Sequence, residues 1–213
     1  MSNRSATHGD FLAAIVADEG EAVRLVHAVP AIAQARVADE RLVEELPHQL
    51  YVGDTALHLA AAAVQPRAVA ALIAAGADAN AANRRRATAL HNACDARPNS
   101  AQTWSPSKQR SVVELLLDAG SDIEHTDKAG AAPLHRAVRA RSPEADRCLL
   151  ERGARVDATH GRRRTTPLHI ATQATGASGT SGARAEQQAI VALLLEYGAD
   201  PRAPDANGQL PRL

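Results

Sequence analysis

The feature that most constrains this chain is a four-residue string that returns along it at a nearly fixed spacing. Its leucine stands at positions 57, 90, 134 and 168, and two of the three intervals differ by a single residue. A second string, a glycine followed by Ala-Asp in two of its four copies, closes each unit after an apolar stretch. Two motifs in one register four times over indicate a tandem repeat. The copies are Thr55–His58, Thr88–His91, Ala132–His135 and Thr166–His169, closed by Gly76, Gly120, Gly153 and Gly198.

Each motif residue suits a position in a pair of helices. The threonines stand where a helix N-cap is wanted, Pro133 and Pro167 where the first helical residue lacks a partner for its N–H, and the glycines where a left-handed residue ends a helix. The two-part motif resembles the ankyrin repeat, a unit of about 33 residues that opens its first helix with T-P-L-H. The resemblance covers roughly Asp10 to Leu213 and implies an all-α solenoid of stacked helix–turn–helix units.

We therefore expect a single ankyrin-repeat domain over residues 1–213. Residues 10–50 hold an N-terminal capping repeat, with two short helices in Phe11–Leu25 split at Asp18–Gly20, and an extra acidic segment, Arg36–Gln49, expected to be a short helix. Residues 51–204 hold four full repeats, and residues 205–213 a C-terminal repeat fragment. The expected helix pairs are 55–63 with 67–75, 88–96 with 109–119, 133–140 with 143–152, and 166–174 with 185–197.

Composition agrees with closely packed helices. Aromatic residues are 2% of the chain, so the apolar content is mainly Ala, Leu and Val, which favours helices over aromatic-layered sheets. The net charge of zero excludes a globally basic nucleic-acid binder. The longest small or apolar run, Ala68 to Ala77, is too short for a membrane span. We expect a cytoplasmic protein, with signal-peptide-independent secretion into a host left open.

A longer period distinguishes alternate repeats. The interval from the motif leucine to the closing glycine is the same in two repeats (57 to 76 and 134 to 153) and is longer by 11 residues in the other two (90 to 120 and 168 to 198). The extra residues fall between the two helices, in Arg97–Lys108 and Thr175–Ala185. Both inserts are rich in Gly, Ser, Pro or Asn, which predicts exposed loops.

The same two repeats carry arginine triplets, Arg84–Arg86 and Arg162–Arg164, at equal offsets before the motif leucine. The third arginine takes the position where ankyrin repeats usually have Gly, and the plain repeats keep that glycine as Gly53 and Gly130. The pattern indicates a duplicated two-repeat block with two basic turns. The alternative is that alternate units inherited loops and arginines without a function.

The chain carries none of the usual catalytic motifs, such as a phosphate-binding glycine loop, a G-x-S-x-G string or an H-E-x-x-H string. The motif histidines are one repeat apart, about 9–10 Å by helix-layer spacing, which is too far to share a zinc ion. The family resemblance implies that they hydrogen-bond between repeats near the turns. We expect no catalytic residues, no metal site and no cofactor.

The resulting hypothesis is a non-catalytic, monomeric protein-interaction module that binds through its concave face, turn tips and inserted loops. The partner is expected to present an acidic surface to the arginines. One alternative is an inhibitor or immunity-type protein that blocks an enzyme or toxin. A second is a nucleic-acid or polyanion binder, which the lack of aromatics among the arginines argues against. The candidate partner-binding residues are Arg84, Arg85, Arg86, Trp104, Arg136, Arg139, Arg162, Arg163 and Arg164; Trp104 fits either a binding hot spot or a pin that holds its own loop.

Overall fold

The computed structural model of the chain describes residues 11, 13–14, 18–38, 49–96, 104–173 and 181–213. These residues form helices and turns, with two isolated bridges, Arg36 to Thr55 and His160 to Thr165. The predicted all-α fold is therefore confirmed for the described part of the chain. Internal contacts group the chain into two compact units, Met1–Asp122 and Ile123–Leu213.

The first helix of each repeat begins at the recurring string, as predicted. The residue before it has extended backbone and serves as the N-cap, for example Thr55 with φ −100° and ψ 169°. The motif leucine lies in the core, with an exposed fraction of 0% for Leu57 and 1% for Leu134. The four helices are α3 (Ala56–Ala62), α5 (Ala89–Asp95), α7 (Pro133–Ala140) and α9 (Pro167–Thr172).

The second helix of each repeat ends at the closing glycine. Gly76 has φ +85°, a left-handed conformation that glycine adopts without a steric penalty. The next residue, Ala77, donates its N–H to the carbonyl of Leu72 at 2.9 Å and satisfies the helix end. The other repeats form the same bond. The described second helices are α2 (Glu19–Ala28), α4 (Pro66–Ala74), α6 (Pro106–Asp118), α8 (Pro143–Glu151) and α10 (Ser181–Glu196), with a 3-10 helix, η1 (Pro30–Gln34), after α2.

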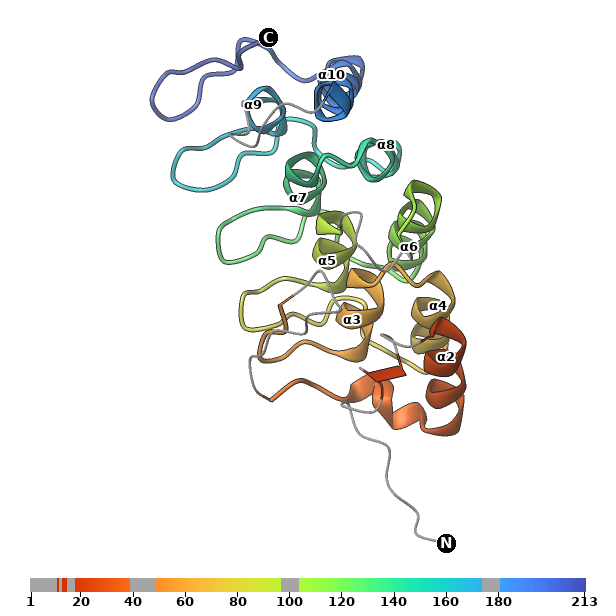
Figure 1. The fold of residues 1–213 in the computed structure, drawn as a ribbon. Coiled ribbons are helices and arrows are strands. Elements are labelled where there is room, and N and C mark those ends of the chain that lie inside the picture. The colour runs from red at the N-terminus through yellow and green to blue at the C-terminus, as the bar shows by residue number, and fades with distance from the viewer. Residues whose placement is uncertain (1–10, 12, 15–17, 39–48, 97–103, 174–180) are drawn as a thin grey trace, which may run out of the picture. The chain divides into compact units, whose positions relative to one another are not determined.

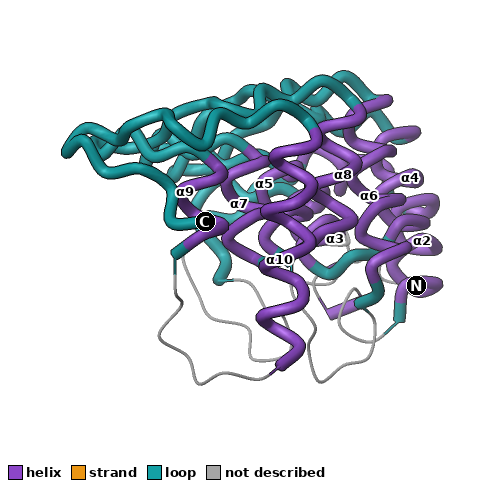
Figure 2. The backbone as a smooth tube through the Cα atoms, turned by 90° about the horizontal axis from the view of Figure 1, so that it is seen from above, coloured by secondary structure: helices purple, strands orange, loops and turns teal. Residues whose placement is uncertain are grey.

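In each unit the helices pack in two rows. In the first unit α3 packs on α5, while α4 packs between α2 and α6 in the second row (Figure 1). In the second unit α7 packs on α9 and α8 on α10. The turns that join successive repeats gather on one side of the helices within each unit (Figure 2). This arrangement places each arginine triplet on the turn side of its unit.

The N-terminal region differs in part from the prediction. The break expected at Asp18–Gly20 is the start of α2, where the Asp18 side chain accepts the N–H of Glu21 at 3.1 Å. The short helix expected over Arg36–Gln49 is wrong at its described end. There Val37 is not helical, and its N–H donates to the carbonyl of Asp54 at 2.7 Å. Residues 39–48, as well as 12 and 15–17, lie outside the described residues.

The inserted segments are also shorter loops than predicted. Helix α6 begins at Pro106 rather than at residue 109, and α10 begins at Ser181 rather than at residue 185. Ser105 caps α6 by accepting the N–H of Lys108 at 3.2 Å, and Pro106 fits the first helical position. The C-terminal end of each insert is therefore the first turn of a helix. Residues 97–103 and 174–180, the rest of the predicted loops, lie outside the described residues.

Candidate functional site

The motif histidines fix the turns on which the candidate residues lie. The N–H of Thr55 donates to Nδ1 of His58 at 3.1 Å, so the ring proton belongs on Nε2. Nε2 lies 3.0 Å from the carbonyl oxygen of Ala87, in the turn of the next repeat. His135 reaches Ala158 and His169 reaches Gln209 in the same way, at 2.9 and 3.0 Å. The predicted hydrogen bonds between repeats are thus confirmed for these three histidines.

In the first unit the arginine triplet lies in a turn held by Asn83. The Asn83 side-chain oxygen accepts the N–H groups of Arg85 and Ala87 at 2.8 and 3.1 Å. The N–H of Arg84 donates to the carbonyl of Val52 at 2.8 Å and so ties this turn to the preceding one. The backbone of the triplet is therefore held by hydrogen bonds within the turn and to the preceding turn, while its three side chains are exposed.

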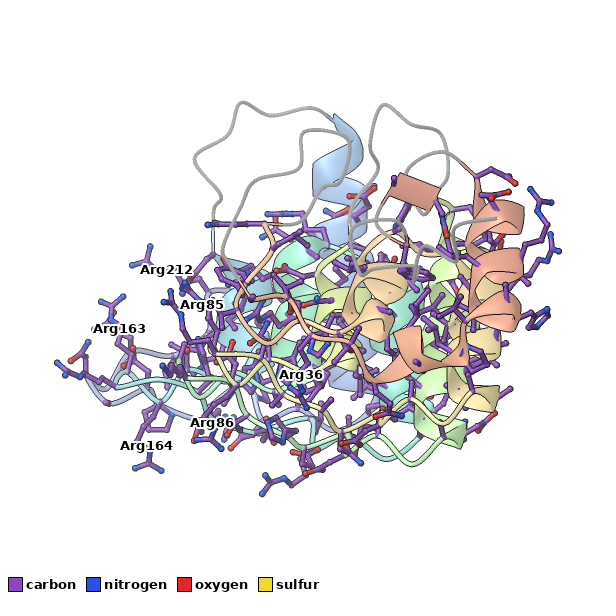
Figure 3. All side chains as sticks on the ribbon, turned by 90° about the horizontal axis from the view of Figure 1, so that it is seen from below. Arg36, Arg85, Arg86, Arg163, Arg164 and Arg212 are labelled. Atoms are coloured by element: carbon purple, nitrogen blue, oxygen red, sulfur yellow. The ribbon has the colours of Figure 1, made fainter. Side chains whose placement is uncertain are left out.

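Two further contacts order this turn. The guanidinium carbon of Arg85 lies 4.9 Å from the ring centre of Tyr51, which is a cation–π arrangement. Arg36 donates through Nη1 to the carbonyl oxygens of Gly53 and Ala82, at 3.3 and 3.2 Å. Figure 3 shows Arg36, Arg85 and Arg86 on the turn side of this unit.

The second triplet lies in a turn built differently. His160 and Thr165 exchange backbone hydrogen bonds of 2.9 and 3.2 Å, and the Thr165 hydroxyl lies 2.8 Å from Nδ1 of His160. Between them stands Gly161, with φ +66°, in addition to the three arginines. This additional residue explains why the last interval between motif leucines is one residue longer than the first. The arginine side chains are exposed, and Arg163 and Arg164 extend from the turn (Figure 3).

The third arginine of each triplet has a left-handed backbone. Arg86 has φ +57° and Arg164 has φ +51°, and in the plain repeats Gly53 and Gly130 have φ +88° and +79°. The structure thus confirms that each of these arginines occupies a glycine position. A non-glycine residue in this conformation costs about 1–2 kcal/mol.

The arginines of α7 differ from each other. Arg136 forms an ion pair with Asp127, and its side chain is 17% exposed. Burial raises the pKa of Asp127, but hydrogen bonds from Arg136 and from the N–H groups of Ala131 and Ala129 outweigh it and hold that pKa below its ordinary value. Arg136 therefore stabilises the turn of its own unit that contains Asp127. Arg139 is exposed on the same helix.

Trp104 is half-buried and lies two residues before the first residue of α6. Its Nε1 donates to Oε1 of Gln109 at 3.2 Å, and Nε2 of Gln109 donates to the carbonyls of Ala93 and Ala96 at 2.8 and 3.2 Å. Trp104 is thus attached to the end of α5 through a buried glutamine. These contacts favour the interpretation that Trp104 holds its own loop over the interpretation that it is a binding hot spot.

A pocket of about 480 Å³ opens in the second unit between α7, α9, α10 and the turn that holds the second triplet. Sequence reasoning missed this pocket, because its apolar residues come from three helices that no motif links. Its wall includes His135 and His160, whose ring centres are 4.9 Å apart. Burial, together with the neighbouring His160, lowers the pKa of His135 to about 4. Five arginines line it: Arg136, Arg139, Arg141, Arg162 and Arg163.

Within the described part of the chain, no group of three or more His, Cys, Asp or Glu side chains is arranged to hold a metal ion. Cys94 and Cys148 are buried and do not form a disulfide. No described helix has the length and apolar character needed to cross a membrane.

Comparison with known proteins agrees with the repeated geometry. A family model for three copies of the ankyrin repeat matches residues 101–205, and a model for a single ankyrin repeat matches residues 52–84. The chain belongs to the ankyrin-repeat family. Ankyrin repeats are generic protein-interaction modules. In this ankyrin-repeat protein, the arginine triplets lie in turns that connect successive repeats.

Curated relatives match only part of the chain. The ARF GTPase-activating protein GIT1 of Homo sapiens, of Mus musculus and of Rattus norvegicus is 41% identical to it over 63 residues. That stretch is 30% of this chain and 7% of each relative. The likeness is therefore confined to a short run of repeats.

Proposed function

We propose that this ankyrin-repeat protein is a non-catalytic interaction module whose two arginine turns, Arg84–Arg86 and Arg162–Arg164, bind acidic groups of a protein partner. The family supplies the general role of protein binding. The observation that carries the finer proposal is the left-handed backbone of Arg86 and Arg164.

The plain repeats show what these turns need for folding. Gly130 adopts φ +79° with no side chain to clash, and an added Cβ would come within 3.3 Å of the backbone nitrogen of Gly161. Arginine at the equivalent position in two repeats carries a steric cost that the glycine of the plain repeats avoids. Folding alone does not account for two such arginines. We therefore infer that their side chains are present because they bind the partner.

The chemistry of the triplets favours a carboxylate partner. A guanidinium group presents a planar fork of donors that matches a carboxylate. Backbone hydrogen bonds position both triplets, so the exposed side chains start from ordered turns. An inhibitor or immunity-type protein would use the same surface, and the identity of the bound partner distinguishes that role.

The test is charge reversal at Arg84, Arg85, Arg162 and Arg163, by substitution of each with Glu. Partners are captured from a lysate of the source organism with the wild-type protein and the variant in parallel, and are identified by mass spectrometry. We expect the proteins captured by the wild type to have acidic surfaces and to be lost from the variant, whose circular dichroism stays helical.

A matched control reverses four exposed cations elsewhere, namely Arg67, Lys108, Arg147 and Arg202. It changes the net charge equally, so a loss caused by overall charge would appear in both variants. Capture of the same proteins by the arginine-turn variant and the wild type would refute the proposal.

A further inference from the structure

The pocket of the second unit has an apolar floor. Val138 on α7, Ile170 and Ala171 on α9, and Ile190 on α10 line it. Carbon atoms supply most of the accessible surface inside it. Its volume of about 480 Å³ is within the range of pockets that enclose ligands, about 300–1,000 Å³, and is large enough for one or two large apolar side chains.

The rim of the same pocket is cationic. Arg139 and Arg141 reach it from α7 and its C-terminal end, and Arg162 and Arg163 from the turn of the next repeat. Arg136 also lines it and forms its ion pair with Asp127. Among the described lining residues there is no Asp or Glu. A cleft lined by one sign of charge attracts groups of the opposite sign.

These two properties point to a particular occupant. The floor takes an apolar side chain, and the rim requires anionic groups on either side of it. Nucleic-acid bases stack on aromatic rings, and no Phe, Tyr or Trp is present among the described lining residues. We propose that the pocket binds a short peptide segment of the partner, in which an apolar side chain on the floor is flanked by acidic residues that pair with Arg139 and Arg162. This inference rests on the proposed function and names the part of the partner that the second unit binds.

The experiment selects peptides from a random twelve-residue phage-displayed library on the full chain. We expect the selected peptides to share acidic residues on both sides of a large apolar residue. Selected sequences are then synthesised, and their affinity is measured by fluorescence anisotropy. Replacement of their acidic residues by amides, or of the apolar residue by Ser, should each weaken binding about tenfold or more.

Two protein variants locate the binding site. Arg139→Glu with Arg162→Glu removes the cationic rim, and Ile170→Ala reduces the floor without changing its charge. Both should weaken peptide binding about tenfold, while Arg147→Glu with Arg202→Glu, at exposed positions outside the pocket, should change it less than about twofold.

The proposal is overturned if no peptide is selected, if selected peptides lack the acidic flanks, or if they bind the rim variant as tightly as the wild type. Failure here is distinct from failure of the proposed function, because Arg84 and Arg85 lie outside this pocket. A partner lost from the four-arginine variant but kept by the rim and floor variants would preserve the proposed function and refute the pocket.

Discussion

A buried carboxylate is the least expected residue of the second unit. Asp146 on α8 is fully buried, and neither of its carboxylate oxygens has a hydrogen-bond partner among the described residues. Seven residues before the closing glycine, the other three repeats carry Val69, Val113 and Val191. Burial raises the pKa of Asp146 well above its ordinary value of 3.8. The repeat thus holds a polar group where its equivalents hold an apolar one.

We predict that Asp146→Val stabilises the protein at neutral pH by about 1–3 kcal/mol, because it removes an unsatisfied buried polar group. The pKa in the folded state is above that in the unfolded state. The contribution of protonated Asp146 to the free energy of unfolding of the wild type is therefore fully present below pH 3.8. It is lost as the pH rises through the raised pKa of Asp146. The advantage of the valine variant should consequently grow with pH in urea unfolding experiments. Asp146→Asn serves as the control, because it removes the charge but keeps an unsatisfied polar group.

At the residue scale, the sequence predicts the parts of the site that recur. The capping threonines, the buried leucines and the left-handed glycine positions follow from four aligned copies. The position of His160 does not follow from the aligned copies, because no other repeat carries a histidine at this position. Its contact with Thr165 forms across the turn that Gly161 lengthens. The one-residue excess in the last interval between motif leucines is the available signal. The pairing of Arg136 with Asp127 was likewise beyond reach, since it joins a helix to a turn nine residues earlier.

In the two repeats that carry inserts, a glutamine side chain bonds the second helix to the first. Gln109 on α6 and Gln187 on α10 both lie 11 residues before the closing glycine. Nε2 of Gln109 donates to Ala93 and that of Gln187 to Ala171, each at 2.8 Å, so each longer second helix is bonded to the last turn of its first helix.

We predict that Gln109→Ala lowers the free energy of unfolding by about 1–3 kcal/mol, because buried carbonyl groups lose their donor. Gln187→Ala should have a smaller effect, since Gln187 is only half-buried and water can replace it. Urea denaturation measures both changes. The exposed neighbour Gln188 provides the control, and an equal loss of stability in Gln188→Ala and Gln187→Ala would contradict the assigned role.

At the element scale, the pattern of recurring motifs, with its resemblance to the ankyrin repeat, predicted every helix pair of the four full repeats to within a few residues. It could not divide the extra residues of each insert between loop and helix, because an insert changes the length of a repeat without marking where the helix resumes. A local signal was present at Ser105–Pro106, a capping residue followed by proline. No comparable signal precedes Ser181, where the helix begins within a Gly- and Ser-rich stretch.

Over the whole molecule, a net charge of zero conceals an uneven distribution. Residues 84–164 carry 16 Lys or Arg against 10 Asp or Glu, whereas residues 1–50 carry 4 against 8. The basic stretch includes both arginine triplets. Its charge would attract an acidic partner at long range, and that attraction weakens as salt increases.

We infer that the arginine turns are kept for binding at the expense of folding. The most direct measurement replaces both triplets with the Lys-Ala-Gly sequence of the plain turn at residues 128–130, and records stability and partner affinity on the same protein. Replacement of each left-handed arginine by glycine should raise the free energy of unfolding by about 1–2 kcal/mol per turn. In the first unit, loss of the Arg85–Tyr51 contact offsets about 0.5–1 kcal/mol of this gain. We expect a higher melting temperature together with a loss of partner affinity of about tenfold or more; a variant that binds the partner as tightly as the wild type would contradict this role of the arginine turns.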